Sequence, residues 1–244
     1  MTDGKYTIGI DVGGTFTDIV AVANEGTVIF SKAPSTPVDP SIGVMDAIAR
    51  LSFELQTDSA SLLAKTERIV HGTTVATNAL LERKGAKTGL LTTLGHRDVL
   101  EMREGLKDDR YNMRLPPPET LVPRYLRLGV NERMRADGTV HRKLDTASLN
   151  AAIETLRGAE VTSVAVCYLH AYKDASHEKE TRERIEAKLP GVSVSLSSEV
   201  FPEIKEYERV STTVVNAYVR PVVEKYLRKL GERLSEAGFN GSVL

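Results

Sequence analysis

The sequence predicts a protein of the α/β class, and three observations support this prediction. Short apolar runs bounded by turn residues alternate with stretches of helical periodicity along the chain. The run 161–169 is apolar enough to form a strand buried on both faces, as in a parallel sheet. Residues 204–238 carry apolar positions at helical spacing. The 244 residues are enough for one large domain or two small ones.

The chain is predicted to begin with an antiparallel meander of three strands, at 6–10, 16–23 and 27–32. Asp39 then caps a helix that has Pro40 at its first position. The fold therefore opens with a meander rather than with a strand–helix–strand unit.

The first turn of the meander, within IGIDVGGTFTD at 8–18, carries the strongest functional signal. Its glycines tolerate positive φ and let backbone N–H groups approach phosphate oxygens, and its threonines add hydroxyl donors. Asp11 is placed to hold Mg²⁺ through water, and Asp18 either joins the site or braces the turn. A plain Gly-Gly hairpin turn is the alternative. The residues predicted to hold a polyphosphate are Gly13, Gly14, Thr15 and Thr17.

A strand at 68–71, a helix at 72–83 and a strand at 87–93 are predicted to form a βαβ unit with adjacent parallel strands. Ligands of open parallel sheets bind beyond the carboxyl ends of the strands. Thr73 and Thr74 lie at that edge, where a helix start offers free N–H groups to an anion.

Two further residues of this segment are candidate catalytic groups. His71 ends the strand and either binds or moves a proton at the phosphoryl acceptor or is a structural histidine. Asn78 lies one turn into the helix and either faces the site or has a core or capping role.

Residues 95–123 lack periodicity, which predicts a lid, an interface segment or a disordered loop. Arg97 and Arg103 in this loop either clamp an anion or are solvated. A hairpin is expected to follow, with strands at 125–134 and 140–143.

A second α/β unit occupies the rest of the chain. Asp145 and Ser176 are predicted to cap its two helices, and Pro221 to break or kink a third helical stretch. Further strands are expected at 161–169 and 192–196, and the beginning of another at 241–244.

The charge, cysteine and histidine content of the chain limits the kinds of partner, location and metal site to be expected. The net charge of −1 gives no reason to expect a nucleic acid or an anionic membrane as partner. Cys167, the single cysteine, lies in an apolar strand, which favours a core role and a reducing, cytoplasmic location. The histidines have no ligand-like spacing, so no protein-bound transition metal is expected.

Five ordered motifs resemble the A-type subunit of the hydantoinase/oxoprolinase family. They are IGIDVGGTFTD, HGTTVATNALLERKGAKTGLLTT, GHRDVLEMR, VAVCYLH and EYERVSTTVVNAYVRP. The resemblance covers about residues 8–244, and the loop GLKDDRYNMRLPPPETLVPR is most similar to acetone and acetophenone carboxylase subunits.

The resemblance implies the first half of an actin/Hsp70/hexokinase-like ATPase lobe with an inserted α/β subdomain. Residues 1–100 and 201–240 would form the lobe, 101–200 the insertion, and 241–244 the start of a second lobe that this chain lacks.

The resemblance also implies a function that uses ATP and Mg²⁺. The leading expectation is part of a ketone carboxylase that phosphorylates a substrate oxygen, bicarbonate, or both. The alternatives are a hydrolase of hydantoins, 5-oxoproline or related cyclic amides, and a non-catalytic nucleotide-sensing or assembly module. The expected partners are the other subunits of a hetero-oligomeric enzyme, including a B-type hydantoinase subunit.

Overall fold

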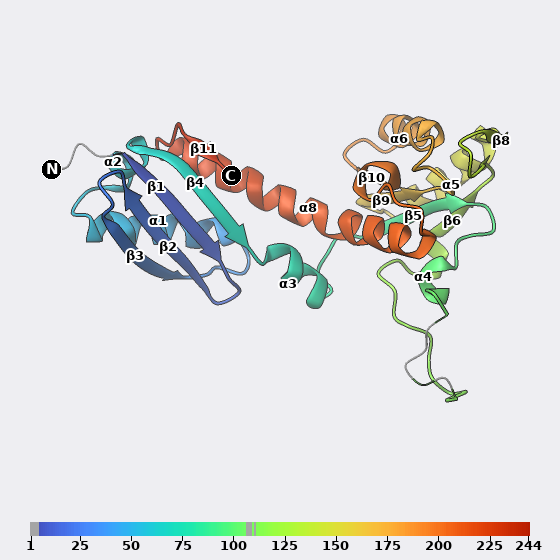
Figure 1. Cartoon of the computed structure of the whole chain (residues 1–244), viewed down its shortest axis with the longest axis horizontal. Coiled ribbons are helices and arrows are strands. Elements are labelled where there is room, and N and C mark those ends of the chain that lie inside the picture. The colour runs from blue at the N-terminus through green and yellow to red at the C-terminus, as the bar shows by residue number, and fades with distance from the viewer. Residues whose placement is uncertain (1–4, 106–108, 110) are drawn as a thin grey trace. The chain divides into compact units, whose positions relative to one another are not determined.

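The computed structural model describes residues 5–105, 109 and 111–244 (Figure 1). The polar start of the chain and part of the predicted loop at 95–123 lie outside the described residues. The chain divides into two compact units, the first formed by Met1–Lys84 with Val222–Leu244 and the second by Gly85–Pro221. This division differs from the predicted boundaries at 100 and 201, and the assignment of the second unit as an insertion in an ATPase lobe stays a prediction.

The first unit is built on a five-stranded sheet of order β11-β4-β1-β2-β3. The predicted meander is confirmed, because β1 pairs with β2, and β2 with β3, in antiparallel fashion. Strand β4 lies parallel to β1 on its other side and pairs in parallel with β11. The strands are β1 (Tyr6–Val12), β2 (Phe16–Ala23), β3 (Val28–Pro34), β4 (Thr66–Thr73) and β11 (Ser242–Val243).

One face of this sheet packs on helices α1 (Pro40–Glu54) and α8 (Glu206–Glu236), through Ile8 and Ile10 of β1. Helix α1 begins as predicted, with Asp39 accepting a hydrogen bond from the Ser41 N–H and Pro40 in the first turn. A short helix, α2 (Ser59–Ala64), was not predicted.

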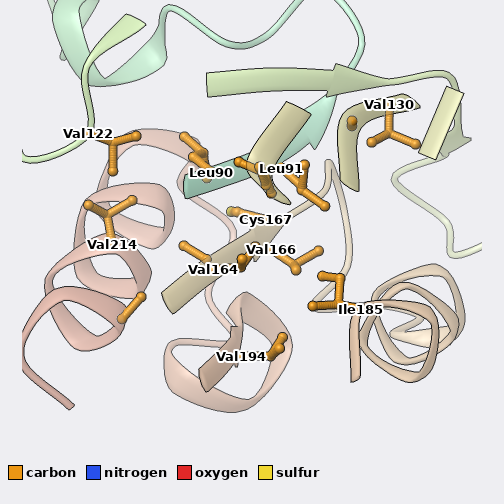
Figure 2. Close-up of a cluster of buried hydrophobic side chains, with 14 of the residues drawn as sticks. Leu90, Leu91, Val122, Val130, Val164, Val166, Cys167, Ile185, Val194 and Val214 are labelled. Atoms are coloured by element: carbon orange, nitrogen blue, oxygen red, sulfur yellow. The ribbon is translucent and has the colours of Figure 1, made fainter. Parts of the chain in front are cut away.

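The second unit holds a four-stranded parallel sheet of order β10-β9-β5-β6. Every residue of β9 is buried, and its apolar side chains form a core with those of α5, α6 and the first part of α8 (Figure 2). The main elements are β5 (Thr88–Thr93), β6 (Arg127–Val130), α5 (Thr146–Gly158), β9 (Ser163–Cys167), α6 (Ser176–Lys188) and β10 (Ser193–Leu196). The short ones are α3 (Val75–Leu81), which belongs to the first unit, α4 (Val99–Met102), η1 (Arg124–Leu126), β7 (Arg133–Met134), β8 (Val140–Arg142) and α7 (Ser197–Val200).

The predicted βαβ unit at 68–93 is wrong. Strands β4 and β5 exist, but they belong to different sheets, because β1 and β11 occupy the two positions beside β4. Of the two outcomes predicted at Pro221, a break or a kink, the break is wrong, since α8 continues through this residue from Glu206 to Glu236, and the kink stays a prediction. A proline inside a helix removes one N–H donor and crowds the carbonyl four residues earlier, but apolar side chains on both halves of α8 pack in hydrophobic cores and outweigh this cost.

Two boundaries differ in detail. Ser176 is the first helical residue of α6 rather than its cap, and its N–H donates to the Asp174 carboxylate. The strand expected at 125–134 is divided into η1, β6 and β7. The α/β class is thus confirmed, and the actin-like assignment stays a prediction. No helix in the described part of the chain is both long and apolar enough to cross a membrane.

Candidate functional site

The turn between β1 and β2 is tight, and hydrogen bonds from a serine stabilise it. The Gly13 N–H donates to the Phe16 carbonyl at 3.0 Å, and a Cβ at Gly13 would lie 3.0 Å from that oxygen. Ser35, just after β3, donates its hydroxyl to the Gly13 carbonyl at 2.8 Å and its N–H to the Thr15 carbonyl at 2.9 Å. Gly14 and Thr15 are exposed, so the turn presents backbone and a hydroxyl to a ligand.

Thr17 does not face the same way as Thr15. It is fully buried, pairs with Val12 across the strands, and its Oγ1 lies 3.0 Å from the Ser35 Oγ. The geometry favours a bracing role, in which Thr17 and Ser35 hold the turn in shape.

Asp11 and Asp18 are directly opposite each other on β1 and β2, on the sheet face away from α1. Asp18 forms an ion pair with Lys32 of β3 at 2.9 Å, but no cation lies near the Asp11 carboxylate among the described residues. Like charges paired across strands destabilise a sheet unless a cation is bound. Gly72 pairs with Asp11 from β4 and leaves space beside its carboxylate.

These residues line a hollow of about 650 Å³ on the open sheet face, together with apolar side chains such as Val20 and Phe30. Two carboxylates with one lysine leave one negative charge for a bound cation. The carboxylate of Asp11 therefore fits a hydrated Mg²⁺, an ion that keeps most of its water.

The start of α3 lies beside the glycine turn, as the prediction requires. The Thr74 N–H donates to the Val12 carbonyl at 3.2 Å, and the Val75 N–H to Thr73 Oγ1 at 3.1 Å. Asn78 donates its Nδ2 to Thr74 Oγ1 at 3.2 Å. A Cβ at Gly14 would lie 3.4 Å from that same nitrogen. The structure thus brings Thr73, Thr74 and Asn78 together with the turn, although two of the N–H donors are already used.

The side chain of His71 lies on the opposite face of the sheet from the glycine-turn site. It pairs with Ile10 across the strands, so its side chain lies on the helix-covered face of the sheet, opposite to Asp11. Its Nε2 lies 2.5 Å from the phenolic oxygen of Tyr226 in α8. Burial lowers the pKa of His71, although the charge of Asp11 partly opposes this, and burial also raises the pKa of Tyr226. The geometry favours a neutral imidazole that anchors α8 to the sheet.

The structure places the remaining candidates, Arg97, Arg103 and Cys167, in different surroundings. Asp98 accepts two hydrogen bonds from Arg124, at 3.0 and 3.1 Å, and Arg97 lies 4.0 Å from the same carboxylate. Arg103 has a positive φ of 51° at the end of α4. Cys167 is buried, and burial raises the pKa of its thiol to about 12, which makes it a core residue. No group of three metal-ligating side chains occurs in residues 5–105, 109 and 111–244.

Three residues with structural roles, Ser35, Tyr226 and Arg209, are not among the residues predicted from the sequence. Arg209 is buried and donates to the carbonyls of Glu203 at 2.7 Å and Tyr168 at 3.2 Å. It thereby ties the beginning of α8 to the end of β9. A buried arginine implies several acceptors, but the sequence does not say which ones.

Comparison with known proteins identifies the family. The model of the hydantoinase/oxoprolinase N-terminal region matches residues 7–189. The chain is 42% identical over 240 residues to the caprolactamase subunit alpha of Pseudomonas jessenii, covering 98% of this chain and 34% of that one. It is 34% identical over 255 residues to the acetophenone carboxylase gamma subunit of Aromatoleum aromaticum, covering 99% and 35%.

The fold agrees with these relatives. The crystal structure of the ATP-dependent caprolactamase from Pseudomonas jessenii superposes with a TM-score of 0.89 at 41% identity, over 98% of this chain and 35% of that one. The chain thus spans about a third of the length of the relatives that it matches. With a family model over residues 7–189 and this degree of identity, the chain belongs to the hydantoinase/oxoprolinase family, in its N-terminal region.

Proposed function

We propose that this chain is the phosphate-binding part of a subunit that transfers a phosphoryl group from ATP to an oxygen of a small substrate. One observation carries the proposal. An exposed glycine turn lies next to Asp11, a carboxylate that has no cation partner among the described residues and faces a second carboxylate. This arrangement supports a bound metal–phosphate group, which supplies both the missing cation and an anion for the turn.

Each residue has a separate task in this proposal. The backbone of Gly13 and Gly14 and the Thr15 hydroxyl would hold the phosphates, while Asp11 would hold Mg²⁺ through its water. Thr73, Thr74 and Asn78 would border the site from α3. ATP supplies the transferable phosphoryl group. Such transfers depend on positioning and on charge neutralisation rather than on a protein nucleophile. Thr17 and Ser35 keep the turn in shape, and Asp18 is held by Lys32.

For the acceptor, the comparisons favour a cyclic amide over a ketone. The identity is 42% to the caprolactamase subunit and 34% to the acetophenone carboxylase subunit, over similar lengths. Phosphorylation of the amide oxygen would make the ring carbonyl carbon more electrophilic. Water would add to that carbon, the C–N bond would break as the nitrogen takes up a proton, and hydrolysis of the acyl phosphate left behind would release inorganic phosphate. The leading expectation from the loop at 105–124, a ketone carboxylase acting with bicarbonate, becomes the second candidate. Partner subunits are part of both proposals, because both relatives are named as subunits.

The test is ATP-dependent phosphate release by the complex purified on this subunit. Stimulation by a lactam or hydantoin alone would support the cyclic-amide hydrolase, and a requirement for ketone plus bicarbonate would support the carboxylase. Asp11→Asn should lower the rate on the order of a hundredfold. The matched control is Asp46→Asn, which changes an exposed carboxylate on α1. An unchanged rate in Asp11→Asn would leave a non-catalytic nucleotide-sensing or assembly module as the better explanation.

A further inference from the structure

The second unit has a ligand-binding edge of its own. Strand β5 leads to β6 on one side of the sheet, whereas β9, which lies beside β5, leads to β10 on the other side. The carboxyl ends of β5 and β9 therefore form a topological switch point. In open parallel sheets this is where ligands bind, because the connections diverge there and leave a crevice.

A buried polar group marks this edge. The Leu169 N–H donates to Thr93 Oγ1 at 3.0 Å, and the Thr93 hydroxyl bonds to the Glu132 carboxylate. The other oxygen of Glu132 lies 2.8 Å from His177 Nδ1, and the Glu132 side chain is fully buried. Glu132 is thus satisfied by these two partners and does not pair with the arginine that follows it.

That arginine, Arg133, lies opposite a second arginine. Arg133 of β7 and Arg142 of β8 are direct cross-strand partners, so their side chains share one face of the ribbon. Both are bonded to neutral groups. The Arg133 guanidinium lies 3.1 Å from His96 Nε2, and Arg142 donates to Asn131 Oδ1 at 2.8 Å. Among the described residues, no carboxylate lies within 4.0 Å of either guanidinium. Paired cations without a counter-ion are unfavourable, and a bound anion would relieve this.

His96 completes the group. Burial lowers its pKa, and so does the charge of Arg133, while Glu206 and Glu132 act in the opposite direction. The imidazole is therefore neutral at pH 7. Since its Nε2 accepts from Arg133, its Nδ1 carries the proton and is a further donor. One hydrogen bond to His96 leaves four of the five guanidinium N–H groups of Arg133 for a ligand.

We propose that Arg133, Arg142 and His96 form a binding site for a small oxyanion at the carboxyl edge of the second sheet. Guanidinium groups bind the two oxygens of a carboxylate, bicarbonate or phosphate side by side, which is a geometry that lysine does not match. The site goes beyond the proposed function, because it lies in the other unit and needs no nucleotide. Its test is therefore independent of ATP binding.

The experiment is an NMR titration of the 244-residue chain, following the Arg side-chain Nε–H and the His imidazole signals. Sodium acetate, bicarbonate and inorganic phosphate are added separately, with chloride keeping the ionic strength constant. Saturable shifts are expected at Arg133 and His96. The anion that saturates at the lowest concentration identifies the source of the oxyanion.

The same ribbon supplies an internal control. Arg135 Nη2 lies 3.0 Å from His141 Nδ1, which makes a second arginine–histidine pair two residues further along the chain. Arg133→Gln and the exposed Arg142→Gln should each weaken binding about tenfold or more, because each removes bonds to a charged ligand. Arg135→Gln should leave binding unchanged.

Two outcomes would overturn the proposal. Shifts that rise linearly and equally at the Arg133 and Arg135 pairs would show charge screening rather than a site. Equal affinity in the wild type and in Arg142→Gln would show that the paired arginines do not act together. The wild-type titration decides the first point by itself, so the test holds even where Arg133→Gln fails to fold.

Discussion

Ser35→Ala tests whether the hydrogen bonds of the Ser35 side chain stabilise the conformation of the glycine turn. The change removes a hydroxyl that bonds to the Gly13 carbonyl at 2.8 Å and to Thr17 Oγ1 at 3.0 Å. Each lost hydrogen bond costs about 1 kcal/mol. The Thr17 hydroxyl, which is fully buried, is also left without that partner. The free energy of unfolding should therefore fall by roughly 2 to 3 kcal/mol.

A matched control is present in the same unit. Ser52 in α1 donates its hydroxyl to the Ala49 carbonyl at 2.8 Å and lies 3.2 Å from the Ser59 hydroxyl. Ser52→Ala therefore loses the same kinds of bond at a site that does not touch the turn. Urea unfolding should be followed by amide signals of the first unit, since two compact units need not unfold together.

Hydrogen exchange at the turn separates the two variants. The Gly13 N–H, bonded to the Phe16 carbonyl, should exchange about fivefold faster in Ser35→Ala and at the wild-type rate in Ser52→Ala. Adding Thr17→Val to Ser35→Ala should recover part of the stability, because it removes the orphaned hydroxyl while keeping the shape. Equal Gly13 exchange in the two single variants would refute the bracing role.

Three further predictions concern the first unit and its boundary. Asp39→Asn should lower the free energy of unfolding of the first unit by about 1 to 2 kcal/mol at pH 7, because it removes a carboxylate that the fold stabilises. Burial alone would raise the pKa of Asp39, but hydrogen bonds from the cations of α8 and from the α1 N-terminus lower it to about 2. Because the pKa of Asp39 is lowered by folding, its carboxylate contributes its full stability only above the ordinary pKa of 3.8. The difference between the variants should be about half lost at pH 3 in urea titrations and should disappear only as the pH falls below about 2. The pKa of His71, measured by NMR, should lie below 6.5, so the neutral imidazole stabilises the unit above that pH and its contribution is lost as the pH falls; an ordinary His71 pKa would contradict its burial. Tyr226→Phe should lower the free energy of unfolding by about 1 kcal/mol, because it removes the hydroxyl next to His71 Nε2. Gly85→Ala should lower the free energy of unfolding, measured by thermal unfolding, by roughly 1 to 3 kcal/mol, because a Cβ there would lie 2.2 Å from a tyrosine ring of α8. In the control variant Gly158→Ala the new Cβ would have nothing within 4 Å, so this change should be neutral or stabilising.

Features of the fold that depend on neighbouring residues could be predicted from the sequence, and those that depend on distant segments could not. The β1–β2 turn, the meander and the caps at Asp39 and Asp145 were predictable, because each depends on residues close together in the chain. Their physical causes are the φ freedom of glycine, the period of two in a strand, and a carboxylate that accepts from the first helical N–H groups.

The sheet face on which each side chain of the site lies was harder to predict from the sequence. Alternation along β1 and β2 places Asp11 and Asp18 on one face and Thr17 on the other, but which face is covered depends on α1. The same holds for His71, whose orientation follows from its pairing with Ile10 and from Tyr226, 155 residues away.

The α/β class, the glycine turn with its acids and hydroxyls, and the buried strand at Cys167 follow from local sequence patterns. Three other features depend on the folded chain: β4 and β5 lie in different sheets, α8 passes through Pro221, and Arg133 lies opposite Arg142. The reason is that strand neighbours and helix continuity are set by contacts between distant segments. Such contacts leave no periodic signal in the segments themselves.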